Sequence, residues 1–340
     1  MVITRCKILF SKIRKKALDV YNWWEKNYYN SLRDEVFGPN KKRYSCGSIY
    51  NDPDEGNKKY YDWLRKFLEI QENKYINDGD RFQYTICNYK GKSRIKVCRN
   101  SETLFFLKSD QFGFSVPKTE NDHEPKKLMR HPYVIYYENK TDKEKALKNI
   151  VNWVYKTRSI GGSFLWPEEE GFNQPPYNIN RGGSQNLRGS SYINDRVDLT
   201  LLELKHFYTV LEILSSKNNE IELCDFIEEY RKIYPGDILG EISLAKSPHL
   251  FMWLRHFDTF DMYIKYFIFD MFVGENNYPI NICASNDNVI IDSTKDKKEI
   301  KIKFWESNFE DLFENLCSKI ISRAQKIEEM ISCEFKDGNF

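Results

Sequence analysis

The sequence lacks the cysteine pattern of a metal site. Its eight cysteines are scattered along 340 residues, without a Cys-x-x-Cys pair and without a cysteine–histidine cluster at zinc spacing. Scattered cysteines of this kind are typical of reduced, structural thiols in a cytoplasmic protein. We therefore expect a cytoplasmic chain with no metal site.

Long apolar runs and a strong net charge are also missing. The most apolar segment, residues 260–273, contains Asp261, Lys265 and Asp270 and is too short to span a bilayer. The N-terminus has no long apolar stretch and no small-residue cleavage site, so we expect no signal peptide and no membrane contact. A net charge of +2 argues against a strongly basic nucleic-acid coat protein but leaves room for a local basic groove.

Changes in the hydrophobic period predict an α+β fold, in which helices flank an antiparallel β-meander core and the C-terminal half is mostly helical. Short β-favouring runs between turn residues predict strands at 82–89, 94–98, 103–107, 112–116, 133–137 and 163–167, with a smaller set within 280–304. Apolar residues three and four apart predict helices at 58–71, 142–156, 198–214, 220–234 and 260–273, one starting at Pro248, and a last one from Phe309 to Ile331.

This pattern divides the chain into three parts. We expect residues 1–50 to form an N-terminal amphipathic helix and a loop, and residues 51–275 to form an α+β core domain. We expect residues 276–340 to add strands and a helix that pack on the core.

The run from Thr157 to Tyr208 is the first place to look for function. Within about fifty residues it contains several arginines, six glycines and six carboxylates, among them Asp195, Asp198 and Glu203. Arginine grips phosphate or carboxylate with a planar fork, and glycine lets the backbone approach a ligand. Carboxylates set against arginines are common in active sites.

Arg158, Gly161 and Gly162 open this run. An arginine at a helix end beside two glycines is well placed to bind a phosphate together with backbone N–H groups. The structural alternative is that Arg158 caps the helix C-terminus and the glycines form an ordinary turn. The motif is neither a P-loop nor a GxGxxG fingerprint.

Asn178 and Arg181 fall in a connection of about twenty-five residues, and loops of that length are usually functional or disordered. We expect both residues to contact substrate. The disordered interpretation applies best to residues 183–191.

Five polar residues follow as the next helix begins: Asp195, Arg196, Asp198, Glu203 and His206. Asp195 and Asp198 can cap the helix or bind substrate. Glu203 lies two turns after Arg196 on one face, and His206 lies one turn further. We predict Glu203, Arg158 and Arg196 as catalytic residues, whereas His206 by itself is more typical of a packed or exposed histidine.

Several motifs in this order resemble a large family of uncharacterised bacterial proteins that share a domain of unknown function. The similarity covers roughly residues 50–275 and includes TRSIGGSFLWP, the later DRVDLTLLELKHFY run and the upstream Asp52-Pro53-Asp54. The family pattern maps onto Arg158, Gly161, Gly162, Pro167, Asn178, Arg181, Gly182, Asp195, Arg196, Asp198, Thr200 and Tyr208. The resemblance implies no activity.

Three functions are compatible with these residues. The first is an effector of the toxin or phage-defence type that transfers ADP-ribose from NAD to RNA or another macromolecule, controlled by an antitoxin or chaperone. The arginines would hold the pyrophosphate, Trp166 and Tyr177 would stack on its rings, and Glu203 would stabilise the oxocarbenium-like ribose. NAD would be a substrate, and no cofactor would be bound permanently.

The second function is a metal-independent ribonuclease, with arginines on the scissile phosphate and His206 or Glu203 as the base. The third is a non-catalytic binding or sensor module that recognises an acidic ligand.

Overall fold

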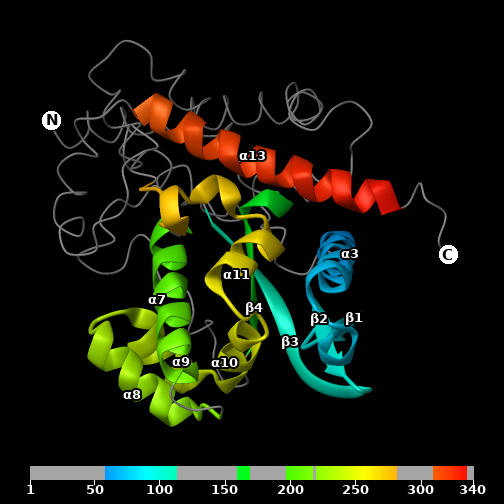
Figure 1. Cartoon of the computed structure of the whole chain (residues 1–340). Coiled ribbons are helices and arrows are strands. Elements are labelled where there is room, and N and C mark those ends of the chain that lie inside the picture. Colours follow the sequence, from blue (N-terminus) through cyan, green and yellow to red (C-terminus); the bar gives the residue numbers. More distant parts are fainter. Residues whose placement is uncertain (1–57, 113–158, 169–196, 217–219, 282–308, 335–340) are drawn as a thin grey trace, which may run out of the picture.

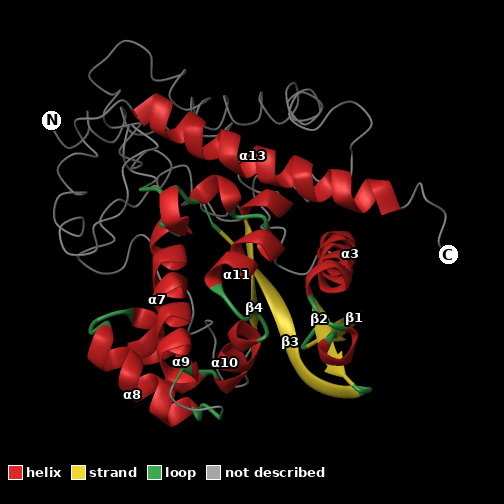
Figure 2. Ribbon diagram, in the orientation of Figure 1, coloured by secondary structure: helices red, strands yellow, loops and turns green. Residues whose placement is uncertain are grey.

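A four-stranded antiparallel sheet with helices packed around it forms the described part of the protein (Figure 1). The structure is a computed structural model that describes residues 58–112, 159–168, 197–216, 220–281 and 309–334. It confirms the predicted α+β fold with a β-meander and a mostly helical C-terminal half. Figure 2 shows the C-terminal helix lying across one end of the other helices.

Neighbouring strands pair antiparallel in the order β1 (Gln83–Tyr89), β2 (Lys92–Arg99), β3 (Glu102–Gln111) and β4 (Ser163–Pro167). In the described ranges the α-helices are α3 (Lys58–Tyr75), α7 (Val197–Ser215), α8 (Leu223–Ile233), α9 (Leu244–Lys246), α10 (Pro248–Arg255), α11 (Phe260–Phe267) and α13 (Phe309–Glu334). Short 3-10 turns are η2 (Asp78–Asp80), η4 (Ile160–Gly162), η6 (Asp270–Phe272) and η7 (Glu275–Asn277), and η5 (Leu239–Ser243) is a π-helical turn.

Strand β3 is longer than the sequence predicts. The Ser109–Asp110 pair, which the sequence marks as a turn, lies inside a strand that ends at Gln111. Two tyrosines of α3 explain the difference. The Tyr60 hydroxyl bonds Ser109 Oγ at 3.0 Å, and the Tyr61 hydroxyl accepts the Ser109 N–H at 3.2 Å. Polar residues can therefore continue a buried strand because their groups are hydrogen-bonded.

The fourth strand of the sheet is β4, which the sequence predicts as a strand without indicating its partner. The run at 112–116 is not confirmed as a strand: Phe112 lies just beyond β3, and the rest of the run lies outside the described residues. The Phe112 N–H instead donates to the Gly162 carbonyl at 2.7 Å.

Helix α11 ends earlier than the sequence predicts. The apolar run at 260–273 predicts one helix, but the helix stops at Phe267 because Ile268 takes a left-handed φ of 55°. A β-branched side chain is unfavourable in that conformation, and Ile268 is held there by its burial in the core. The usual sequence signal for such an end is glycine or asparagine, which is absent here.

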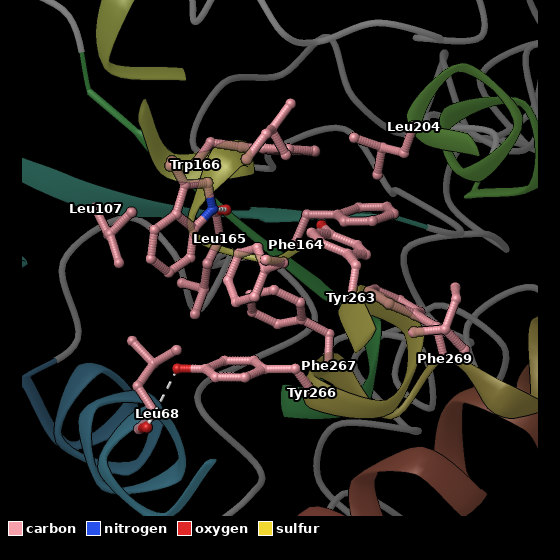
Figure 3. Packing of buried hydrophobic residues seen from close by; sticks show 14 of the residues in the cluster. Leu68, Leu107, Phe164, Leu165, Trp166, Leu204, Tyr263, Tyr266, Phe267 and Phe269 are labelled. Atoms are coloured by element: carbon pink, nitrogen blue, oxygen red, sulfur yellow. Dashed lines mark hydrogen bonds between the residues drawn. The ribbon is translucent and has the colours of Figure 1, made fainter. Parts of the chain in front are cut away.

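Aromatic rings fill much of the core. Figure 3 shows Phe164 and Trp166 of β4 close to rings from α11 and the segment after it. Phe164 stacks on Trp166 at 5.2 Å and lies 4.9 Å from the Phe269 ring. The indole N–H of Trp253 in α10 donates to the Leu165 carbonyl at 3.0 Å. Burying rings of this size is a large part of the stabilisation of a core.

One buried carboxylate links α3, the sheet and the C-terminal helices. Glu72 Oε1 lies 2.7 Å from His256 Nε2 and accepts the Phe82 N–H at 2.6 Å. Glu72 Oε2 accepts the hydroxyls of Tyr84 at 2.9 Å and Tyr266 at 2.6 Å. Burial alone would raise the pKa of Glu72, but the hydrogen bond and charge of His256 and the other donors outweigh it and hold the pKa below its ordinary value.

One buried cation ties α13 to the core. Arg323 is 2% exposed. Its Nη1 donates to the carbonyls of Gly161 at 2.7 Å and Ser163 at 2.9 Å, and its Nε donates to the Phe267 carbonyl at 2.9 Å. The guanidinium lies 4.0 Å from the centroid of the Phe269 ring. Burial lowers the pKa of Arg323 to about 9, so the side chain stays charged at neutral pH.

Within the described ranges no helix is long and apolar enough to cross a membrane. Several predicted elements lie outside these ranges: the N-terminal helix, the strand at 133–137, the helix at 142–156 and most of the strands at 280–304.

Candidate functional site

The structure describes four of the nine residues predicted to form the site. Gly161, Gly162, Asp198 and Glu203 are described, and all four are buried. The other five lie outside the described residues: Arg158, Asn178, Arg181, Asp195 and Arg196. Their predicted convergence on one cleft therefore stays a prediction.

Gly161 and Gly162 form the turn η4, directly before β4. A Cβ on Gly161 would lie 2.0 Å from the Ile320 carbonyl oxygen and 2.7 Å from the Ala324 nitrogen, both in the backbone of α13. The absence of a side chain thus allows a close approach by a helix. Phosphate binding, which we expected from the sequence, has no support in these contacts.

Glu203 lies on the buried side of α7 and is bonded to the π-helical turn. Its Oε2 accepts the Leu239 N–H at 2.8 Å, and its backbone carbonyl accepts the Tyr230 hydroxyl at 3.0 Å. The first N–H groups of a helical turn have no partner within the turn. Glu203 therefore supplies an acceptor that η5 needs, and this is a structural role.

We expect Glu203→Gln to lower the free energy of unfolding by about 1 kcal/mol, because the amide oxygen can still accept the Leu239 N–H but the charge is lost. Glu203→Leu should cost about 3 kcal/mol, since it leaves that N–H buried without this acceptor. Denaturant unfolding measures both. Glu212→Gln, at an exposed position of the same helix, is the matched control and should change stability by less than about 0.5 kcal/mol. A Glu203→Leu protein as stable as the wild type would contradict the structural role.

His206, one turn beyond Glu203, is paired with a carboxylate that the sequence analysis missed. The His206 Nδ1 lies 2.6 Å from Asp237 Oδ2, and the imidazole stacks on the Tyr234 ring with centroids 3.8 Å apart and planes 5° from parallel. The His206 and Asp237 side chains are 14% and 15% exposed. Among the described residues, none bonds His206 Nε2.

This geometry fixes the chemistry of the imidazole. A carboxylate can only accept, so Asp237 selects the tautomer in which Nδ1 carries the proton and Nε2 carries a lone pair. An imidazole held in this way is suited to take a proton from a substrate, and the carboxylate then stabilises the imidazolium that forms.

Asp237 is itself held by α8 and η5. The Tyr230 hydroxyl lies 3.0 Å from Asp237 Oδ2, and the Tyr230 ring packs so closely on Gly240 that a Cβ there would lie 2.2 Å from Cδ1. Burial first, and then the charges of Glu203 and Asp237, raise the pKa of Tyr230 far above its ordinary value. The phenol therefore keeps its single proton, which the Asp237 carboxylate and the Glu203 carbonyl share.

The sequence holds only a weak signal for this cluster. Asp237 follows Pro235-Gly236 in a turn, where aspartate is common for local reasons. Nothing in the spacing links it to His206. Within the described residues no group of three His, Cys, Asp or Glu side chains could hold a metal ion.

One family matches the chain. The model of DUF6994, a family of unknown function, matches residues 43–232, which is more than half of the chain. The resemblance to a domain of unknown function is thus confirmed, over a segment that ends earlier than residue 275. No curated protein and no solved structure matches the chain.

Proposed function

The chain belongs to DUF6994, whose function is unknown, and from its geometry we propose that it is a metal-independent ribonuclease with His206 as the general base. The observation that carries the proposal is the pairing of His206 Nδ1 with Asp237 Oδ2 at 2.6 Å, in which both side chains are mostly buried but remain partly exposed to solvent. This arrangement leaves Nε2 with a lone pair for a substrate proton.

In the proposed reaction, Nε2 takes the proton of a ribose 2′-hydroxyl and the 2′-oxygen attacks the adjacent phosphorus. The bond from phosphorus to the 5′-oxygen breaks, the 5′-oxygen takes a proton from water, and the imidazolium returns its proton to the solvent, which leaves a 2′,3′-cyclic phosphate, a 5′-hydroxyl and neutral His206. Asp237 stabilises the imidazolium during the step. Arg158, Arg181 and Arg196 are the proposed ligands of the phosphate, because guanidinium groups stabilise its developing charge.

The described geometry favours this reaction over ADP-ribose transfer. Trp166, which we expected to stack on NAD, is 1% exposed and packs on Phe164. Glu203, which we expected to stabilise the ribose cation, is engaged with the Leu239 N–H. ADP-ribose transfer stays a prediction that depends on residues outside the described ranges.

The biological setting that we propose is a toxin or phage-defence effector that acts on RNA in the cytoplasm. An antitoxin or chaperone would keep such an activity in check. The alternative is a module that binds an acidic ligand without catalysis. The following experiment distinguishes it from a ribonuclease.

We expect the purified chain to cleave labelled single-stranded RNA in the presence of EDTA and to leave 2′,3′-cyclic phosphate ends. His206→Asn keeps a donor for Asp237 but removes the base, so it should slow cleavage by about two orders of magnitude or more. Asp237→Asn should also slow it, because the amide no longer selects the tautomer. The rate of product formation, measured with purified variants, tests both.

His249→Asn on α10 is the matched control and should cleave at the wild-type rate. Consumption of labelled NAD in place of RNA, or full activity in His206→Asn, would contradict the proposal. RNA binding without cleavage would favour the binding module.

A further inference from the structure

The solvent-facing side of strands β1–β3 combines lysines with an aromatic ring pair. The opposite side is buried, through residues such as Tyr84, Val97 and Phe105. On the solvent-facing side Lys96 pairs across the strands with Thr85 and with Phe106. We call this side the outer face; its exposed or half-buried residues include Thr85, Tyr89, Lys92, Lys96, Leu104, Phe106 and Lys108, whereas Arg94 and Cys98, which the register places on the same side, are buried.

Phe106 is the centre of the outer face. Its ring stacks on Tyr89 with centroids 4.2 Å apart and planes 19° from parallel. No ring among the described residues contacts its other side. Phe106 is not part of the buried core cluster, so the core does not explain a large aromatic residue at this position. A half-buried ring held flat by a second ring is a surface on which a planar group can stack.

Positive charge surrounds this ring. Lys96 is the cross-strand partner of Phe106, and Lys108 lies two residues along β3 on the same side. Lys92 continues the row on β2, four residues from Lys96. Lys92, Lys96 and Lys108 form no ion pair with any described residue.

Acidic residues are scarce on these strands. Glu102 lies at the turn between β2 and β3, and Asp110 is buried at the far end of β3. The charge of the buried Arg94 is neutralised by an ion pair with Glu168. The outer face therefore has a net positive charge although the chain as a whole is nearly neutral.

We propose that the outer face binds single-stranded nucleic acid, with one base stacked on Phe106 and phosphates on Lys92, Lys96 and Lys108. Rows of lysines beside stacking rings on a sheet are a general solution for binding single strands without sequence preference. An acidic peptide would use the lysines but not the ring, and a duplex would hide its base faces. The proposal is independent of catalysis, because Figure 1 shows α7, which bears His206, well away from β1 and β2.

Fluorescence anisotropy with labelled oligonucleotides of about twelve nucleotides tests the proposal on the full chain. His206→Asn is used as the background protein, so that binding is measured without RNA cleavage. The binding result can then be interpreted even if the ribonuclease proposal is wrong. We expect single-stranded RNA and DNA to bind, and the corresponding duplex to bind more weakly. Preference for RNA over DNA would indicate contacts to the 2′-hydroxyl.

Phe106→Leu keeps apolar bulk but removes the ring, and should weaken binding at least about fivefold. Phe106→Tyr should bind like the background protein. A Lys96→Gln, Lys108→Gln double variant should lower the slope of log Kd against log salt by about 1.4, at about 0.7 for each phosphate contact. Thermal melting confirms that each variant is folded.

Lys232→Gln with Lys246→Gln removes two exposed lysines elsewhere, and Tyr278→Leu removes an exposed ring; both control proteins should bind normally. The proposal is overturned if no single strand binds, if Phe106→Leu binds like the background, or if polyglutamate competes as well as the oligonucleotide.

Discussion

Replacing Arg323 with methionine should lower the free energy of unfolding by about 3 kcal/mol or more. The change removes the donor to the buried carbonyls of Gly161, Ser163 and Phe267. A buried polar group that loses its partner costs about 1–3 kcal/mol. The loss is partly offset because the variant no longer buries a charge, a penalty that is visible in the lowered pKa of about 9. Urea unfolding followed by circular dichroism measures the difference.

Lys326→Met is the matched control. Lys326 lies one turn further along α13, but its ammonium is half-exposed and pairs with Asp270 at 2.6 Å. Exposed pairs of this kind contribute about 0–1 kcal/mol, so this variant should remain close to the wild type. If Arg323→Met and Lys326→Met unfold at the same denaturant concentration, Arg323 does not hold α13 on the core.

Glu72→Gln should have an effect of similar size, about 3–5 kcal/mol. The amide keeps the volume, but its NH₂ group faces donors, because the Phe82 N–H and the hydroxyls of Tyr84 and Tyr266 all point at the carboxylate. His256 also loses the charge that it faces in a pocket where both side chains are 2% exposed. The midpoint of denaturant unfolding reports the loss.

The same residue predicts how stability depends on pH. The pKa of Glu72 is lower in the folded protein than the ordinary value of 4.5. A depressed carboxyl pKa stabilises the folded state above the unfolded value, and this stabilisation is lost as pH falls through the folded value. Wild-type stability should therefore decline below about pH 4.5, and Glu72→Gln should flatten part of that decline.

Glu69→Gln is the control for both experiments. Glu69 lies on the same helix, and its side chain is 40% exposed and pairs with Arg65. The substitution should cost less than about 1 kcal/mol and leave the acid response unchanged. An equal loss of stability in Glu69→Gln and Glu72→Gln would show that the buried hydrogen bonds of Glu72 contribute no more to stability than an exposed ion pair.

Local patterns in the sequence predicted most elements of the fold. Strands β1 to β3 follow from β-favouring runs between turns, and α7 from apolar residues at helical spacing, because both signals depend only on near neighbours. Errors arose where a distant contact decided the outcome. Tyr60 and Tyr61 keep Ser109 in a strand, and core packing holds Ile268 in a conformation that normally needs glycine.

The candidate site was harder to predict for the same reason. His206 could be placed on a helix face, but its value as a base depends on Asp237, which is 31 residues away and lies in a turn that the π-helical segment positions. Gly161 as a phosphate ligand stays a prediction, and what the structure adds is its close approach to the backbone of α13, which no local pattern indicates. Complementarity between distant residues leaves no periodic trace in one sequence.

The long sequence separation of the buried polar contacts has a consequence for synthesis on the ribosome. Glu72 is made 184 residues before His256, and Gly161 is made 162 residues before Arg323. At a synthesis rate of about 5–20 residues per second, on the order of 10–40 s pass between the synthesis of Glu72 and that of His256. During that interval the emerging sheet and α3 lack the aromatic surfaces of α10 and α11. The apolar side of the emerging sheet therefore lacks its covering helices until most of the chain has been made.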